Sequence, residues 1–335
     1  MKEIRLGTIG SGMIVRAILD NVKLTDGIRL TAVYSRSEEK GRALAQEYGA
    51  DRVYTDLDAF LADEDMNFVY IASPNLLHYA QTKQALLAGK NVICEKPFCT
   101  RADQAAELVF IAKKRRLFLV DAVPTSFLPN LEIIRKELPR LGRIRLVLAN
   151  YSQYSSRYDQ LLAGEIPNVF NPAFGGGCLM DINFYNVYLM VLLFGRPLEA
   201  VYYPNRFGEL ADTSKTADTS GVVFMRYDDF VSQLAAAKDT WGVNSFQIEG
   251  EKGFLYIRDG SNGLAEVRVV TKDSDETYND QPNPDRWFYE VQNMTKMLLA
   301  EDCGAVGKRL ETMLIVMEIL ETVRKKAGIH FPGDR

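Results

Sequence analysis

Two glycines spaced one residue apart stand where a first strand would pass into a helix, and this spacing suits phosphate binding. The strand is predicted at Ile4–Ile9, and the helix begins at about Met13. Gly10 would permit a tight turn, and Gly12 would let the backbone approach a pyrophosphate bound by the free N–H groups of the helix. The residues assigned to this site are Gly10, Ser11, Gly12, Met13 and Ile14. Val15 stands where the full pattern has Gly or Ala, so a plain strand–helix turn is the alternative.

The residues after the second predicted strand bear on which dinucleotide would bind. Leu30–Tyr34 is followed by Ser35 and Arg36, with Lys40 close behind. An NAD site usually has Asp or Glu here for the ribose 2′-hydroxyl, and no carboxylate occupies the first positions after this strand. A hydroxyl and a guanidinium suit a 2′-phosphate instead, because Arg makes charge-assisted hydrogen bonds to phosphate. We therefore predict NADP as the cofactor and NAD as the second choice. The alternative is that Arg36 is a solvated surface residue, since two glutamates follow closely.

A lysine follows a later buried strand. Asn91–Glu95 is predicted as that strand, and Lys96 and Pro97 come next. Open α/β sheets bind ligands at the carboxyl ends of their parallel strands. At that position the Lys96 ammonium could donate a hydrogen bond to a reacting hydroxyl and favour an oxyanion. By itself this tripeptide would also suit a strand end with a turn.

The elements around these residues predict two kinds of sheet. Over residues 1–122, short β-branched runs alternate with helical patterns, which predicts a parallel sheet with right-handed crossovers. The second half is predicted to contain helices at 128–138, 178–194, 285–300 and 307–327, a long strand at 144–154 and six shorter strands between 198 and 270. The polar residues 271–285 are expected to form an exposed loop. We thus expect an α/β protein with a Rossmann-type domain over 1–122. An α+β domain with a large open, mainly antiparallel sheet would follow over 123–335.

The composition excludes several classes of protein. The 335 residues carry 40 basic and 44 acidic side chains, a net charge of −4, which gives no support for nucleic-acid binding. The apolar run Val187–Phe194 is too short to span a bilayer, and the N-terminus lacks the features of a signal peptide. With two histidines and no Cys-x-x-Cys pair, no metal site is expected. The four cysteines are expected to be reduced thiols in a cytoplasmic protein.

Several motifs together resemble one known family. They are Ile9–Gly12, Ala32–Arg36, Ser73-Pro74-Asn75 with His78, Ala88–Val92, Glu95-Lys96-Pro97 and Gly175–Asp181. In this order, and at this chain length, they resemble the glucose–fructose oxidoreductase / inositol dehydrogenase (Gfo/Idh/MocA) family over essentially the whole chain. The resemblance is closest to the branch of the dihydrodiol dehydrogenases and glucose–fructose oxidoreductase.

The resemblance implies roles for particular residues. It implies that Lys96 is catalytic, that Tyr185 is the acid/base where many members have His, and that Asp181 belongs to the same site. The residues that it places beside the cofactor are Ser73, Pro74, Asn75, His78, Glu95 and Lys96. The two catalytic side chains, from separate halves of the chain, would meet over the bound nicotinamide.

Tyr185 can be judged on chemistry as well. It lies four residues after Asp181, so the two should share one face of the predicted helix. An ordinary tyrosine has a pKa of about 10, which is too high for a base at neutral pH. A neighbouring ammonium would lower this pKa by favouring phenolate. The alternative is that Phe184, Tyr185 and Tyr188 are apolar bulk in the core.

These observations predict an NADP-dependent oxidoreductase that moves a hydride between nicotinamide and a sugar, polyol or related alcohol or carbonyl compound. Two alternatives stay open: a redox-neutral glycosidase or lyase with tightly held cofactor, and a non-catalytic NADP-binding sensor. The expected partners are a small-molecule substrate and a second copy of the chain, and neither nucleic acid nor a membrane. A homodimer or higher oligomer would cover the sheet face that the helices leave open, a face through which members of the family commonly pair.

Overall fold

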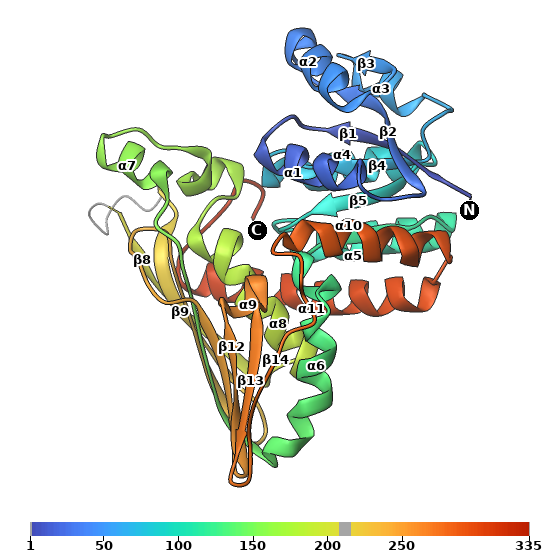
Figure 1. Ribbon diagram of the computed structural model, residues 1–335. Helices are drawn as coiled ribbons and strands as arrows, with labels where there is room; N and C mark the ends of the chain where they lie inside the picture. The colour runs from blue at the N-terminus through green and yellow to red at the C-terminus, as the bar shows by residue number, and fades with distance from the viewer. Residues whose placement is uncertain (1, 208–215, 335) are drawn as a thin grey trace. The chain divides into compact units, whose positions relative to one another are not determined.

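The computed structural model describes residues 2–207 and 216–334. The chain forms two compact units. One runs to Pro124 and includes Trp287–Leu314, and the other consists of Thr125–Arg286 with the residues from Ile315 onward. Each unit has its own sheet (Figure 1).

The first unit is built on a six-stranded sheet in which every pair of neighbouring strands is parallel. The strands are β1 (Ile4–Ile9), β2 (Ile28–Tyr34), β3 (Arg52–Tyr54), β4 (Phe68–Ile71), β5 (Asn91–Glu95) and β6 (Leu119–Ala122). Their order, β3-β2-β1-β4-β5-β6, is that of a Rossmann fold, and the order reverses between β1 and β4. The predicted parallel sheet is therefore confirmed, although the three-residue strand β3 was not foreseen.

Helices connect these strands, and the chain adds further helices to this unit when it returns from the second unit at Trp287. They are α1 (Met13–Val22), α2 (Glu38–Tyr48), α3 (Leu57–Leu61), α4 (Asn75–Leu87), α5 (Ala102–Arg115), α10 (Arg286–Leu299) and the first half of α11 (Cys303–Lys326), whose residues from Ile315 onward belong to the second unit. One contact shows why Trp287–Leu314 packs with the first unit. Arg309 on α11 donates to the side chain and to the carbonyl of Asp121 on β6, each at 3.1 Å, and both residues are buried. An ion pair out of water needs such added hydrogen bonds to be tolerated.

The second unit is built on an eight-stranded mixed sheet. Its strands are β7 (Ile144–Ser152), β8 (Glu199–Arg206), β9 (Asp218–Arg226), β10 (Val231–Ala237), β11 (Ser245–Gly250), β12 (Gly253–Arg258), β13 (Glu266–Thr271) and β14 (Asp275–Tyr278). The order is β14-β13-β12-β11-β7-β10-β9-β8, and all pairs are antiparallel except β7 with β10. The mainly antiparallel sheet is confirmed. The prediction of a loop over 271–285 was wrong in part, because β14 pairs with β13 there.

The helices α6 (Asn130–Glu137), α7 (Ser156–Leu162) and α8 (Phe184–Phe194) and the single turn α9 (Gly260–Gly263) belong to this unit. Two of these helices cover one face of the sheet. α6 and α8 lie along the same side of the strands (Figure 1). Side chains alternate accordingly: on β10, Leu234 and Ala236 are buried, while Val231 and Gln233 are exposed.

The segment Pro172–Phe194 is long and apolar enough to cross a membrane, judged by length and composition. Within its most apolar window, however, 78% of the residues are buried inside the structure. The core helix of a globular protein meets the same criterion, so this segment is weak evidence for a membrane span.

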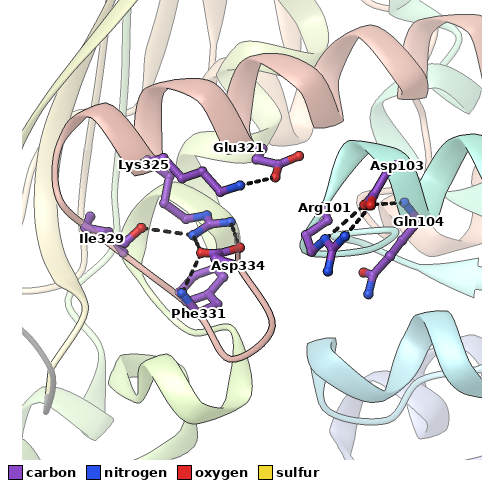
Figure 2. A network of polar contacts seen from close by, with 9 residues as sticks. Arg101, Asp103, Gln104, Glu321, Lys325, Ile329, Phe331 and Asp334 are labelled. Carbon is purple, nitrogen blue, oxygen red and sulfur yellow. Dashed lines mark hydrogen bonds and ion pairs between the residues drawn. The ribbon is translucent and has the colours of Figure 1, made fainter.

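The end of the chain is fixed by a buried arginine (Figure 2). The Arg324 side chain is fully buried, pairs with Asp334 through both terminal nitrogens and donates to the Ile329 carbonyl at 2.9 Å. Phe331 lies with its ring 4.1 Å from the guanidinium and donates its N–H to Asp334 at 2.7 Å. Burial alone would raise the pKa of Asp334, but the bonds from Arg324 and Phe331 outweigh burial and hold this pKa below its ordinary value.

We expect Asp334→Asn to lower the free energy of unfolding by about 2–3 kcal/mol at pH 7, because it leaves a buried guanidinium without its counter-charge. A depressed carboxyl pKa stabilises the fold above the unfolded value of about 3.9, and this stabilisation is lost as the pH falls through the folded value. Urea unfolding at pH values between 7 and 3.5 should therefore show that the difference in unfolding free energy between the variant and the wild type becomes smaller as the pH falls. Asp273→Asn, at an exposed site, is the control. A gap of constant size would contradict the assignment.

Candidate functional site

A cavity of about 340 Å³ lies in the first unit where the strand order reverses. It is lined by Ile9, Gly10, Ser11, Gly12, Tyr34, Ser35, Arg36, Ser37, Lys40, Ala72, Ser73, Pro74, Leu77 and Gln81. The structure thus brings together the predicted residues Gly10, Ser11, Gly12, Ser35, Arg36, Lys40, Ser73 and Pro74. Ligands of open α/β sheets bind at this kind of switch point, outside the carboxyl ends of the strands.

The glycine turn has the geometry of a phosphate cradle. Gly10 has φ +119°, and a Cβ atom there would lie 2.7 Å from the Ala72 carbonyl oxygen, so this position requires glycine. A Cβ on Gly12 would meet no atom within 4 Å, which leaves the approach to the start of α1 open. Among the described residues, no side chain caps α1 and no acidic residue lies in its first turn. The first N–H groups of α1 are thus available to an anion, and the turn fits a dinucleotide.

The opposite wall of the cavity carries two cationic side chains. Ser37 caps α2 by accepting from the Lys40 N–H at 3.4 Å, and Ser35 accepts from the Ser37 N–H at 3.3 Å. This arrangement brings the exposed Arg36 and Lys40 to the cavity. Within the described part of the chain, neither side chain forms an ion pair.

One of the two glutamates that follow Arg36 forms an ion pair with another residue. Glu38 forms an ion pair with Arg42 at 2.6 Å on the surface of α2. Its negative charge is therefore balanced by a residue that does not line the cavity. The wall at Arg36 and Lys40 thus suits a dianionic phosphate.

The other predicted cofactor residues do not line this cavity: Met13, Ile14, Asn75, His78, Glu95 and Lys96. Met13 is 84% exposed at the start of α1. His78 is buried on α4, with its two ring nitrogens 2.8 Å from the carbonyl oxygens of Ser73 and Pro97. The two carbonyl oxygens favour the protonated ring and would raise the pKa of His78, but burial has the larger effect and lowers this pKa below its ordinary value. His78 therefore connects α4 to the segments that carry Pro74 and Lys96.

Lys96 follows a fixed strand end. The buried carboxylate of Glu95 accepts from the Tyr70 hydroxyl at 2.6 Å and from the backbone N–H of Lys96 at 3.1 Å. Burial and the Glu95 charge raise the pKa of Tyr70 well above its usual range, so the phenol stays a hydrogen-bond donor. The half-buried Lys96 is thereby held at the carboxyl end of β5.

In the second unit, the predicted helix 178–194 is divided in two. Leu179–Asn183 forms a π-helical turn, and α8 begins at Phe184. Such turns are wider than an α-helical turn and are frequent at functional sites. Asp181 lies in the π-turn, half exposed, and Tyr185 lies in the first turn of α8, 5% exposed. Their four-residue spacing therefore crosses a junction between helix types, unlike the single regular helix expected.

Two charged residues that the sequence analysis missed hold this segment. Lys238, 7% exposed at the end of β10, pairs with Asp181 at 2.5 Å. Buried Asp218 accepts from the Leu179 N–H and the Tyr202 hydroxyl, both at 2.6 Å. Burial raises the pKa of Asp218 despite these bonds. The partners are 57 and 39 residues apart in sequence, so no local pattern could have paired them.

The glycine motif makes room for Asp218. Gly177 has φ +128°, and a Cβ atom there would lie 2.2 Å from an Asp218 carboxylate oxygen. The close approach of this carboxylate to the π-turn therefore requires glycine at position 177.

Buried amides fix the register of α8 on the sheet. Asn183 donates to the Leu234 carbonyl at 3.1 Å, and Asn186 donates to the Ala235 carbonyl at 3.0 Å. Ser261 of α9 donates to Asn186 at 2.6 Å. Because both amides bind consecutive carbonyls of β10, α8 can neither slide nor rotate without breaking buried hydrogen bonds.

Tyr185 itself lies among aromatic and cationic groups. Its ring is in edge contact with the rings of Tyr151 and Phe184, at centroid distances of 5.9 and 5.8 Å. The Arg286 guanidinium lies 5.9 Å from the Tyr185 ring centre. Phe184 and Tyr188 are fully buried. This agrees with the alternative interpretation of the sequence, in which Phe184, Tyr185 and Tyr188 all pack in the core. Tyr185 is 5% exposed and lies beside an arginine.

Comparisons with known proteins agree with this architecture. Residues 4–121 match a family described as "Oxidoreductase family, NAD-binding Rossmann fold", and residues 137–256 match "GFO/IDH/MocA C-terminal domain". An uncharacterized oxidoreductase of Escherichia coli is 34% identical and covers 99% of this chain and 98% of its own. The scyllo-inositol 2-dehydrogenase (NADP(+)) of Bacillus subtilis is 33% identical, covering 99% of each chain. A pig trans-1,2-dihydrobenzene-1,2-diol dehydrogenase is 25% identical, again covering 99% of each.

A solved structure shows the same fold. The 3-ketoreductase from Actinomadura kijaniata, described in complex with NADP and TDP-benzene, superposes with a TM-score of 0.83 at 23% identity, covering 96% of this chain and 97% of its own. Fold and site thus define a two-part oxidoreductase whose first part has a Rossmann-type dinucleotide-binding fold. The chain belongs to the Gfo/Idh/MocA family, and the dihydrodiol dehydrogenases are among its relatives. The predicted family and branch are therefore confirmed.

Proposed function

We propose that this protein is an NADP-dependent oxidoreductase that moves a hydride between nicotinamide and a CH–OH or C=O carbon of a sugar or polyol. One observation carries the proposal: the cavity at the Gly10–Gly12 turn also holds Arg36 and Lys40, which have no ion-pair partner among the described residues. The open start of α1 would bind the pyrophosphate, and the two cations would bind the 2′-phosphate. NAD lacks the 2′-phosphate, so Arg36 and Lys40 would contribute less to its binding free energy.

The relatives support both cofactor and substrate class. The names of the Bacillus subtilis enzyme and of a D-xylose 1-dehydrogenase from Hypocrea jecorina, 26% identical, both specify NADP(+). Their substrates are a polyol and a sugar, and the pig enzyme acts on a diol. All three oxidise a carbon that carries a hydroxyl. We infer the same reaction type for this chain.

The residues of this chain would handle the proton. When bound, NADP supplies the acceptor for the hydride. Tyr185 would take the hydroxyl proton at its phenolic oxygen, and Lys96 would donate a hydrogen bond from Nζ to the same substrate oxygen. Asp181 holds the ion pair with Lys238 and would act by fixing the turn before Tyr185. The tie between Glu95 and the Lys96 backbone would fix the position of Lys96.

We further propose that two copies pair through the open sheet face. Tyr203, Phe224 and Val231 on β8, β9 and β10 are 65%, 43% and 50% exposed, and the first two rings lie 6.0 Å apart. An exposed apolar patch of this kind is typical of a protein interface. We propose that the same face of a second copy covers this patch, because a two-fold axis pairs identical surfaces and the exposed face of one sheet can be complementary to itself.

We also infer a reducing, cytoplasmic location. All four cysteines are free thiols, and Cys94, Cys99 and Cys178 are buried. Burial raises the pKa of the Cys94 thiol to about 12. Such thiols act as small apolar side chains, and free thiols persist in a reducing compartment.

Arg36→Ala should weaken NADPH binding about 10- to 100-fold and change NADH binding less than about twofold, because it removes charge-assisted bonds to the 2′-phosphate alone. Fluorescence titration of both reduced cofactors measures this. Arg29→Ala is the control, because Arg29 lies on β2, is paired with Glu3 and does not line the cavity. Equal loss for NADPH and NADH would refute the assignment of Arg36.

Lys96→Met and Tyr185→Phe should each lower kcat/KM by about 100-fold or more, since each removes a group that holds or accepts the proton. The assay follows NADPH absorbance with scyllo-inositol, D-xylose and trans-1,2-dihydrobenzene-1,2-diol. Tyr188→Phe removes a phenol from the same helix and should keep its activity. Full turnover by both variants would end the proposed roles. Product without net NADPH change would instead favour redox-neutral chemistry.

Phe224→Asp should convert a dimer into a monomer in sedimentation at micromolar concentration, because it places a charge in the apolar patch without touching the core. Phe110→Asp, at a 64% exposed site on α5, is the matched control and should stay dimeric. A monomeric wild type, or a dimer that survives Phe224→Asp, would contradict the interface.

A further inference from the structure

A second cavity, of about 540 Å³, lies in the second unit. Its lining includes Tyr151 and Gln153 from the end of β7, Asn244, Asp259, Asn262 and Arg286. It is larger than the 340 Å³ cavity of the first unit and lies within the range typical of small-molecule sites. The proposed cofactor binding does not use it.

Tyr185 does not line this cavity, but it lies next to two residues that do. Tyr151 and Arg286 both line the cavity, and each also lies 5.9 Å from the centre of the Tyr185 ring. A molecule in the cavity would therefore be separated from the proposed proton acceptor by a single side chain. This places the cavity where the part of a substrate remote from the reacting carbon would lie.

The walls of the cavity are held by hydrogen bonds. Buried Asn130 donates to the Leu264 carbonyl at 2.6 Å and to Asn279 at 2.9 Å, and it accepts from the Asp280 N–H at 2.7 Å. Asp259 and Leu264 take left-handed backbone conformations, with φ +62° and +45°, at the two ends of α9. Strain of this kind persists where the surroundings impose it, so the cavity is formed before a ligand enters.

Several lining groups have spare hydrogen-bonding capacity. Gln153 and Asn244 use their side-chain oxygens, at 3.4 Å from the Tyr151 hydroxyl and 2.8 Å from the Ser152 N–H, and their NH2 groups have no partner among the described residues. Asp259 meets Arg258 at a long 3.4 Å, which leaves its carboxylate able to accept. The side-chain oxygen of Asn262 is also buried, and it has no hydrogen-bond partner in the part of the chain that the structure describes.

This mixture of donors and acceptors selects the chemistry of the ligand. Arg258 and Arg286 also line the cavity, so its charge does not decide against an anion. A carboxylate or phosphate, however, accepts hydrogen bonds and does not donate them, so it could not satisfy the acceptor oxygens of Asp259 and Asn262. A hydroxyl both donates and accepts, so neighbouring hydroxyls can satisfy the NH2 groups and the carboxylate together.

We propose that this cavity binds the polyhydroxyl part of the substrate, and that Gln153 and Asn244 determine which neutral polyol or sugar is accepted. The inference rests on the proposed function, since it identifies the substrate pocket of that reaction. Each NH2 group would donate to a hydroxyl oxygen remote from the reacting carbon.

The test measures binding without turnover. NADPH and an alcohol do not react with each other, so calorimetry can titrate scyllo-inositol, D-xylose and D-glucose into the full-length NADPH complex. For the polyol that the wild type binds best, Gln153→Met and Asn244→Asp should each raise Kd about tenfold, because each removes one donor. Asn244→Asp keeps the oxygen that accepts from Ser152, which protects the fold. The Kd of trans-1,2-cyclohexanediol, which lacks the remote hydroxyls, should change less than about twofold in both variants.

The outcomes separate this inference from the proposed function. Gln46→Met, on exposed α2, is the control and should leave every Kd unchanged. Unchanged polyol Kd in both cavity variants, an equal loss for cyclohexanediol, or a wild type that binds no polyol of the panel would overturn the pocket assignment. Failure to bind NADPH would instead overturn the proposed function, and the same polyol titrations without cofactor would still decide the pocket.

Discussion

Anion binding by the first unit depends on positive charge that has no internal partner at the carboxyl edge of the parallel sheet. The N–H groups at the start of α1 are uncapped among the described residues, and Arg36 and Lys40 add two full charges beside the same cavity. Like charges held this close together repel each other, and a bound anion would offset this repulsion. Gly10 makes the arrangement feasible, since any side chain there would strike the Ala72 carbonyl.

The second unit solves a different problem, that of holding one helix in a single register. A long apolar helix packs almost equally well in several registers, because apolar contacts have little direction. Buried polar groups remove this ambiguity, since each loses its partner if the helix shifts. Asn183 and Asn186 bind β10, while Lys238 and Asp218 hold the π-turn from two other positions. Tyr185 inherits its position from these four contacts.

The sequence predicted what local spacing controls and missed what long-range contacts control. The strand–helix alternation and the residues after β1 and β2 follow from periodicity and turn chemistry, so the parallel sheet and six cavity residues were foreseen in this way, whereas Ser73 and Pro74 came from the family resemblance. β14 was missed because its charged residues suit a loop until β13 pairs with them. The π-turn and Lys238 were missed for the same reason, since each depends on a partner tens of residues away. The roles of Lys96 and Tyr185 came from family resemblance and stay predictions.

The two cavities differ in chemistry in the way that a division between cofactor and substrate requires. The first concentrates donors and positive charge, which suits phosphates whatever else the ligand carries. The second mixes amide donors and two arginines with the Asp259 and Asn262 acceptors, so a ligand that only accepts hydrogen bonds would leave part of its lining unsatisfied. A hydroxyl both donates and accepts, so a molecule with several hydroxyls could satisfy both kinds of group at once, which is the physical basis of the substrate pocket proposed for the second unit.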